Sequence, residues 1–390
     1  MAFQSILIYT ILMGIMLLCA YITAIKNYFH TGYSVIKGRS FLRVETLFPI
    51  ILFAIIFGMR YDVGFDYVGY LYGYIKHIDV GKGEILFNAF THLFQDYDFH
   101  FIIYFGTIAF IQVFFFFYAF KKERFLFPLL VFFLFMNDDF MFWMNVIRQS
   151  LAMCIWIFSL KYIEQRQFWK YLMWCLVAYG FHNSAITLII LYPILRNGKD
   201  YFKNISIQLI ILCGAFVIQQ IFARILPSLI PTVEHYVSFL GSDQYEGYIR
   251  RGLEVEAGTS NGTGLAYFFK IALNVVIVCF SKHLKNFYKS KRFRIIYSLF
   301  FIGLVTLYMF PVGSIVLTRP FRYFYVFQMI MYAHFGYFLF KAKNVRYKYI
   351  LAGLIVAFLG IFYLHQITAD NDSHLWFQFY FQQNGAIAKY

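Results

Sequence analysis

Charged residues are scarce in this sequence, and their scarcity defines the class of protein. Only 14% of the 390 residues are Asp, Glu, Lys or Arg, whereas a soluble domain carries about a quarter. The short segments of strict polar and apolar alternation that a membrane β-barrel requires are also missing. The apolar residues, 61% of the chain, fall instead in runs long enough to cross a bilayer as helices. We therefore predict an all-α integral membrane protein.

Three further absences narrow this prediction. The five cysteines lie far from any CxxC spacing, so neither a disulfide framework nor a metal site is indicated. The first apolar segment, residues 3–25, lacks a basic n-region and a small-residue cleavage site, so we expect a spanning helix and not a cleaved signal peptide. No internal repeat relates the two halves of the chain, which counts against a transporter built from repeats.

The apolar runs predict about twelve transmembrane helices. Their expected cores are residues 3–25, 43–59, 99–120, 125–138, 144–161, 168–181, 183–196, 205–226, 264–281, 294–311, 321–340 and 347–366. One set of connections holds 23 of the 34 basic residues and only four of the 19 acidic residues. The positive-inside rule assigns that set to the cytoplasm, which makes both termini external. The net charge of +15 then reflects loops that lie against the lipid bilayer, and no nucleic-acid partner is expected.

We expect a single polytopic membrane domain over residues 1–390, with two long external loops as substrate-site elements. These loops are residues 60–98 and 227–263. Long connections in compact proteins are usually functional or disordered. The second loop holds Arg250, Arg251 and a glycine-rich run, which suits a mobile lid, with a disordered linker as the alternative.

Several polar residues lie at the predicted outer ends of the helices. Arginines on the outer side are unexpected there, because basic residues usually face the cytoplasm. The polar residues are Arg60 and Asp66 after the second span, Arg148 at the start of the fifth, His182 between the sixth and seventh, and Arg319 and Arg322 at the start of the eleventh. A lone arginine at a membrane edge can simply snorkel to the interface. Six polar residues on one predicted face favour a shared ligand instead.

An anion is the ligand that best explains this group. Three of the helices concerned begin at the outer face, where free N–H groups and the helix dipole favour negative charge. Arginines there form a fork-shaped cradle for phosphate or pyrophosphate. Structural alternatives stay open: Arg148 can pair with Asp138 or Asp139, Arg319 can pair with the acidic first loop, and His182 can be a hydrogen-bonded hairpin residue.

Four motifs contain these residues, and together they carry a resemblance. They are Arg60-Tyr-Asp-Val-Gly-Phe-Asp66-Tyr67, Arg148-Gln149-Ser-Leu-Ala152, Phe181-His182-Asn-Ser184-Ala185 and Arg319-Pro-Phe-Arg322-Tyr323-Phe324. In this order and spacing they resemble the EpsG family of polysaccharide polymerases, which is akin to the Wzy O-antigen polymerases. The resemblance covers roughly residues 43–340.

This resemblance implies a GT-C-like glycosyltransferase of the bacterial plasma (inner) membrane, with an active site that faces the periplasm or exterior. It would transfer a growing glycan from undecaprenyl pyrophosphate to a new lipid-linked oligosaccharide repeat unit, with a chain-length regulator and a flippase as partners. A flippase or transporter of the lipid-linked saccharide stays an alternative, although the charged residues stop near the outer face. A related O-antigen ligase or membrane acyltransferase also stays open.

The reaction assigns a role to each motif. The arginines Arg60, Arg148, Arg319 and Arg322 are expected to bind pyrophosphate and to stabilise the departing charge, so neither a metal nor another cofactor is predicted. Asp66 is the favoured general base and His182 the second candidate. Supporting positions are Asp62, Tyr67, Tyr323, Arg250 and Arg251, and the carboxylates of Asp62 and Asp66 could together hold one divalent ion.

Overall fold

The fold is described from a computed structural model that covers residues 2–31, 40–81, 83–239, 264–310, 318–342, 347–368 and 376–382. Over these residues the secondary structure is helical, and the one extended pairing is an isolated antiparallel bridge between Arg60 and Phe379. The prediction of an all-α protein is therefore confirmed.

The chain divides into two compact units. Unit 1 comprises residues 1–197 and 332–390, and unit 2 comprises residues 198–331. The boundary at 331 falls inside helix α16 (Arg322–Lys341), which therefore contributes to both units. That the whole chain acts as a single polytopic domain stays a prediction.

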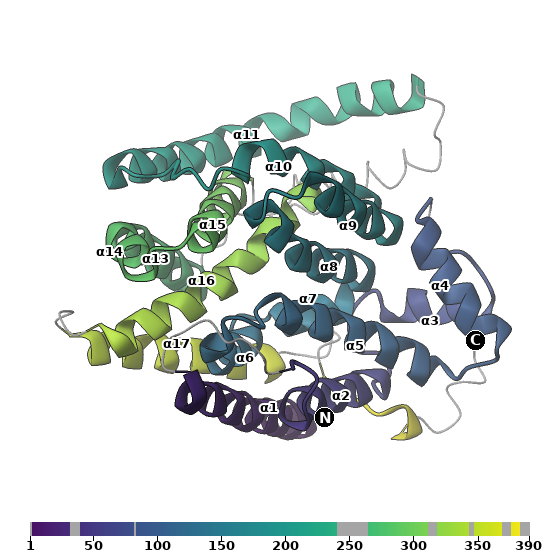
Figure 1. The fold of residues 1–390 in the computed structure, drawn as a ribbon. Coiled ribbons are helices and arrows are strands. Elements are labelled where there is room, and N and C mark those ends of the chain that lie inside the picture. Colours follow the sequence, from purple (N-terminus) through teal and green to yellow (C-terminus); the bar gives the residue numbers. More distant parts are fainter. Residues whose placement is uncertain are drawn as a thin grey trace. The chain divides into compact units, whose positions relative to one another are not determined.

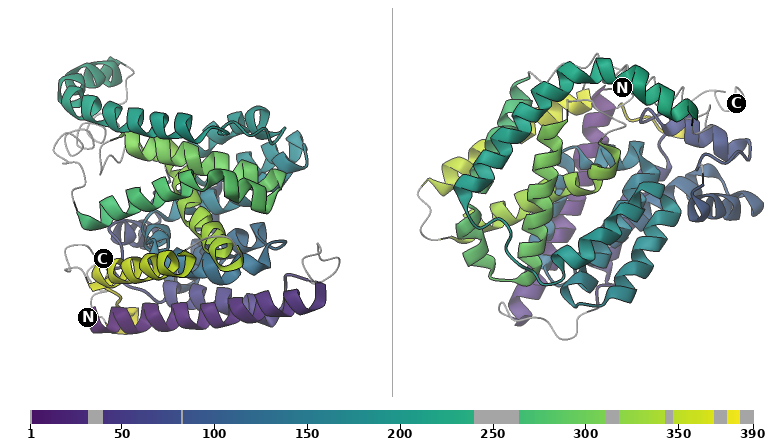
Figure 2. Two further views of the ribbon diagram at one scale, coloured as in Figure 1. Left: turned by 90° about the vertical axis from the view of Figure 1, so that its left-hand side faces the viewer. Right: turned by 90° about the horizontal axis from the view of Figure 1, so that it is seen from above.

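Unit 1 contains most of the helices (Figure 1). They are α1 (Ala2–Thr31), α2 (Val44–Gly58), α3 (Tyr67–Ile75), α4 (Ile85–Asp96), α5 (Phe101–Ala119), η1 (Arg124–Leu126), α6 (Phe127–Met136), α7 (Asp139–Asn145), α8 (Ile147–Glu164), α9 (Phe168–Phe181), η2 (Asn183–Ile190), α10 (Leu191–Leu195), α17 (Lys348–Thr368) and η5 (Tyr380–Gln382). Helix α5 packs between α2 and α8, and α8 packs in turn on α9. Helix α1 lies beside α17, as Figure 2 shows, and also contacts α2 and α6.

Unit 2 is built around a pair of long helices. Its elements are α11 (Ile205–Phe239), α13 (Leu265–Cys279), α14 (Ser281–Tyr288), α15 (Lys291–Met309) and η3 (Arg319–Phe321). Helices α11 and α15 pack against each other, and Gln219 of α11 donates a hydrogen bond to the carbonyl of Phe310 at 2.8 Å. Buried amide side chains of this kind fix one helix against the next without exposing a polar group to lipid.

Small residues allow α2 and α5 to approach closely in unit 1. A Cβ atom on Gly58 would lie 2.5 Å from the carbonyl oxygen of Ile102, and one on Gly106 would lie 3.1 Å from that of Ala54. Close helix crossings in membranes commonly use such small residues. Gly58 is the last residue of α2 and lies two residues before Arg60.

Among the described residues, five helices are long and apolar enough to cross a membrane, namely residues 2–26, 101–119, 205–225, 291–309 and 348–368. Two bent pairs, α6 with α7 at 65° and α13 with α14 at 58°, raise the number to seven if each counts as one span. Every predicted core overlaps a helix, and α9 has the predicted bounds. Twelve spans are not confirmed, because several of these helices are short, and the external position of both termini stays a prediction.

The predicted loop at 60–98 is largely helical. It contains α3 and α4, which are too short and too polar to be recognised as spans. Helix α4 buries Phe87, Thr91, Phe94 and Gln95, which lie on one face at helical spacing. In the second predicted loop, at 227–263, α11 extends to Phe239 and residues 240–263 lie outside the described residues, Arg250 and Arg251 among them.

Candidate functional site

A buried carboxylate joins two of the sequence motifs. Glu84, which directly precedes α4, is 3% exposed. Its Oε2 lies 2.5 Å from Nη1 of Arg148 in the first turn of α8, and its Oε1 lies 2.6 Å from Nδ1 of His182 at the end of α9. The backbone N–H of Asn183 also donates to Oε1 at 3.4 Å. Three elements distant in sequence therefore meet at one carboxylate.

The local backbone explains how Glu84 reaches this position. Gly83 has a φ of +72°, a left-handed conformation that favours glycine, and it turns the chain into α4. A Cβ atom on Gly180 of α9 would lie 2.5 Å from the side chain of Leu86, so the glycine allows α4 to lie directly on the last turn of α9. Glu84 lies two residues before Leu86, and His182 lies two residues after Gly180, so this contact brings the two side chains together.

The surroundings of Glu84 favour its ionised form. Burial raises the pKa of the carboxyl, but the hydrogen bond from His182 and the charge of Arg148 outweigh burial, so the pKa lies below its ordinary value. Glu84 is therefore a carboxylate at neutral pH, held by two basic side chains.

The contact with Glu84 also determines what His182 can do. Because a carboxylate only accepts hydrogen bonds, Nδ1 carries the proton and Nε2 of the neutral ring is an acceptor. Nε2 is buried and has no hydrogen-bond partner among the described residues. Leaving a buried polar atom unpaired costs about 1–3 kcal/mol, so stability alone does not explain its placement. A ring oriented by a carboxylate, with the other nitrogen available, is the arrangement of a general base.

Arg148 is the second partner of Glu84 and lies against aromatic rings. Its Nε donates to the hydroxyl of Tyr70 at 3.2 Å, and its guanidinium lies 5.7 Å from the ring centre of Tyr70 and 5.8 Å from that of Phe87. The side chain is 22% exposed. Within the described part of the chain, Nε and Nη1 make these hydrogen bonds, which leaves Nη2 for an anion. The alternative partners Asp138 and Asp139 do not pair with Arg148 there; Asp139 accepts from Asn137.

Arg60 is more deeply buried than the sequence suggests. It is 2% exposed, donates from Nη2 to the carbonyl of Met144 at 2.8 Å, and lies within 6 Å of the ring centres of Phe57, Tyr67 and Phe105. Its backbone pairs with Phe379 of the C-terminal segment. These contacts give Arg60 a structural role at the end of α2, and its binding of pyrophosphate stays a prediction.

The rest of the first motif lies at the same place. Asp66 is exposed, and its backbone N–H donates to Oδ1 of Asn145 at 2.8 Å. Tyr67 is fully buried and donates from its hydroxyl to the carbonyl of Arg60 at 2.8 Å. Asp62 adopts a left-handed φ of 52° and is partly exposed. The role of Asp66 as a base, and any ion held with Asp62, stay predictions.

Residues 144–148, where α7 gives way to α8, gather three of the motifs. Met144 accepts from Arg60, Asn145 accepts from Asp66, and Arg148 binds Glu84, which in turn binds His182. The first, second and third motifs are therefore neighbours in unit 1. This convergence was expected from the shared membrane face, but the carboxylate at its centre was not.

The fourth motif belongs to unit 2 and is described there by itself. Arg319 and Pro320 form the 3₁₀ turn η3, and Arg322 opens α16 with its backbone N–H bonded to the carbonyl of Thr318 at 3.0 Å. Both arginines are partly exposed, whereas Tyr323 is fully buried. Their binding of pyrophosphate stays a prediction. Among the described residues, no three His, Cys, Asp or Glu side chains are grouped to hold a metal ion.

These features define a helical membrane protein with a buried carboxylate, arginine and histidine cluster at one end of unit 1. The EpsG family model matches residues 45–381, so the chain belongs to the EpsG family, as its motifs suggested. No curated protein and no solved structure matches the sequence. Membership points to a membrane protein of polysaccharide biosynthesis.

Proposed function

We propose that this protein is a polysaccharide polymerase that works at the outer face of the bacterial plasma membrane. It transfers a growing glycan from undecaprenyl pyrophosphate to a single repeat unit carried by a second undecaprenyl pyrophosphate. Family membership supports a glycosyltransferase of this type, and the apolar helices support a reaction within the membrane. The observation that carries the proposal is the contact between Glu84 and His182.

The proposed reaction exchanges one bond for another. The bond between the anomeric carbon of the donor glycan and the pyrophosphate oxygen breaks, and the acceptor hydroxyl oxygen forms a new bond to that carbon. The hydroxyl proton moves to Nε2 of His182, while the lipid pyrophosphate leaves with the bonding electron pair. No oxidant or reductant is required.

Glu84 and Arg148 support this reaction in different ways. The Glu84 carboxylate keeps the proton of His182 on Nδ1 and stabilises the imidazolium that forms after proton transfer. We assign the stabilisation of the departing pyrophosphate to Nη2 of Arg148, while pyrophosphate binding by Arg319 and Arg322 of unit 2 stays a separate prediction. Asp66 stays the alternative base; it is exposed, whereas His182 is buried beside Glu84.

Glycan length in a deletion strain tests the function. Loss of a polymerase leaves surface glycans of one repeat unit, and complementation with the wild-type gene restores long chains. Complementation with Glu84→Gln should leave single repeats, while Glu45→Gln, which removes a carboxylate from the distant ion pairs with Lys26 and Arg43, should restore long chains.

Two outcomes would contradict the proposal. Absent surface glycan with lipid-linked repeat units accumulating in the cytoplasm would indicate a flippase. Long glycans that fail to reach their final acceptor would indicate a ligase.

A further inference from the structure

A cavity lies in unit 1, separate from the Glu84 cluster. Its volume is about 570 Å³, which is within the usual range of ligand pockets. It is open on one side and is lined by residues of the segment before α2, the C-terminal half of α5, the turn into α6, α8 and α9. Phe158 of α8 lines it, ten residues after Arg148, which corresponds to about 15 Å along the helix. A molecule in this cavity is therefore not positioned to react at His182.

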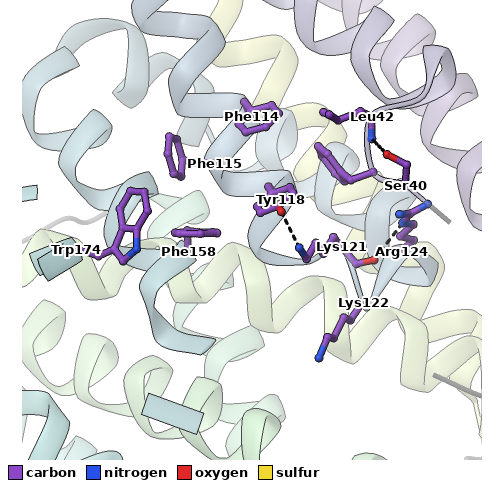
Figure 3. Close-up of a pocket in the computed structure, with 11 residues that line it drawn as sticks. Ser40, Leu42, Phe114, Phe115, Tyr118, Lys121, Lys122, Arg124, Phe158 and Trp174 are labelled. Carbon is purple, nitrogen blue, oxygen red and sulfur yellow. Dashed lines mark hydrogen bonds between the residues drawn. The ribbon is translucent and has the colours of Figure 1, made fainter. Parts of the chain in front are cut away.

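One wall of this cavity is aromatic. Figure 3 shows Phe115, Phe158 and Trp174 side by side on the lining. Their rings pack edge to face, with centres 5.3 Å apart for Phe115 and Phe158 and 4.8 Å apart for Phe158 and Trp174. Mutual packing fixes the three rings, so the wall is a preformed apolar surface.

The opposite side of the cavity is basic. Lys121, Lys122 and Arg124 line it from the turn that follows α5. Lys121 donates from Nζ to the hydroxyl of Tyr118 at 2.7 Å, which holds its ammonium at the cavity, while Lys122 is exposed. No acidic residue lines the cavity in the described part of the chain, and Glu123 of the same turn is not on the lining. The carbonyl end of α5 opposes an anion only weakly compared with three full positive charges.

An aromatic wall and a basic rim together select one kind of ligand. A free anion would use only the rim, and a neutral lipid would use only the wall. An anionic lipid uses both, because its phosphate meets the cations while its hydrocarbon lies on the rings. Basic pockets between membrane helices bind acidic headgroups by the same chemistry.

We propose that this cavity is a binding site for an anionic phospholipid of the surrounding bilayer. The phosphodiester lies at Lys121, Lys122 and Arg124, and the acyl chains lie along Phe115, Phe158 and Trp174. The basic side of the chain faces the cytoplasm in the predicted orientation, and that leaflet is rich in anionic lipid. The site thereby anchors the end of α5, α8 and α9 that lies away from the Glu84 cluster.

Lipid retention by the purified full-length protein tests this inference. Native mass spectrometry would compare bound phosphatidylglycerol with phosphatidylcholine of the same acyl chains. We expect preferential retention of phosphatidylglycerol, and a decrease in that preference of roughly 10- to 30-fold in Lys121→Gln/Lys122→Gln, since each lysine near a lipid surface contributes about fivefold or slightly less. The matched control Lys203→Gln/Lys282→Gln removes the same charge from exposed positions of unit 2 and should keep the preference.

Competition identifies the occupant. Inorganic phosphate at equal concentration should not displace phosphatidylglycerol, because it gains nothing from the aromatic wall. If the double variant does not fold, Lys122→Gln alone is tested, and its preference for phosphatidylglycerol should decrease several-fold. Equal retention of both phospholipids, an equal loss in the control, or stronger binding of a polyprenyl phosphate than of phosphatidylglycerol would overturn the inference.

Discussion

Nδ1 of His182 lies 2.6 Å from Oε1 of Glu84, although 98 positions separate the two residues in the chain. The contact links the start of α4 to the end of α9 at a point where both side chains are buried. Arg148 binds the other carboxylate oxygen, so the pair is part of a charged network and not an isolated hydrogen bond. The predictions below follow from this arrangement.

The first prediction concerns the charge on Glu84. Glu84→Gln preserves the shape of the side chain but no longer stabilises an imidazolium at His182, so turnover should fall roughly 100-fold or more. Because Glu84 is a positioning residue, the acidic limb of the pH–rate profile should also move to lower pH. Turnover of lipid-linked repeat units by the purified protein gives both readings.

Glu45→Gln is the control for this measurement. Glu45 of α2 pairs with Lys26 of α1 at 3.5 Å and with Arg43, which directly precedes α2, at 3.9 Å. Its loss should leave turnover within about twofold, because such exposed pairs contribute little. A normal rate and an unchanged profile in Glu84→Gln would remove Glu84 from the mechanism.

The second prediction concerns the geometry of Arg148. Its guanidinium meets Glu84 through Nη1 and Tyr70 through Nε, and a lysine can keep only one of these contacts. Arg148→Lys should therefore lose about 10- to 100-fold in turnover, as expected for one hydrogen bond to a charged group. Steady-state kinetics beside Arg43→Lys, an exposed control, would measure this. Full activity of Arg148→Lys would show that positive charge alone suffices.

The third prediction tests the packing that holds the pair together. Gly180→Ala places a methyl group 2.5 Å from the Leu86 side chain and should push α4 away from α9, with a cost of about 1–3 kcal/mol in stability. Adding Leu86→Ala removes the two closest atoms, Cγ and Cδ1, and leaves only the Cβ of residue 86, at 2.9 Å, so it should restore part of the lost activity. Melting temperature and turnover of the single and double variants would be compared. Activity that the second substitution does not restore would argue against this packing.

The fourth prediction is a dependence of stability on pH. The pKa of Glu84 is lower in the folded protein than its ordinary value of about 4.5, so its ion pair with Arg148 and its hydrogen bond with His182 contribute fully above that pH. Their contribution is lost as the pH falls through the lowered folded pKa. Melting temperatures in detergent should show wild type above Glu84→Gln near pH 7, with the difference shrinking below about pH 4.5. A constant difference across this range would contradict the assignment.

The positions of the helices were predicted from the sequence more accurately than the number of helices that span the membrane. Helix α9 has the predicted bounds because Lys170 is the only charged residue between Phe168 and Phe181. Helices α3 and α4 were missed, because short helices rich in Tyr and polar residues do not resemble membrane spans. Amino-acid composition identifies the apolar segments that form long helices. It does not identify the shorter, more polar segments that also fold into helices and pack against them.

The site was predicted in part. Arg148 and His182 stood out because charged and titratable residues at helix ends are conspicuous in an apolar chain. Glu84 did not stand out, since it follows Gly81-Lys82-Gly83 in an acidic loop and its partners lie 64 and 98 positions away. Arg60 looked like a ligand-binding residue, and only the fold reveals that three aromatic rings surround it.

In the proposed mechanism His182, oriented by Glu84, removes the proton from the acceptor hydroxyl. Purified protein supplied with lipid-linked repeat units would be assayed for release of undecaprenyl pyrophosphate and for glycan length, as wild type, His182→Asn and Asp66→Asn with matched melting temperatures. We expect the polymerisation rate to fall about 100- to 10,000-fold in His182→Asn and to stay near normal in Asp66→Asn. Near-normal polymerisation by His182→Asn, with the loss falling on Asp66→Asn, would contradict it.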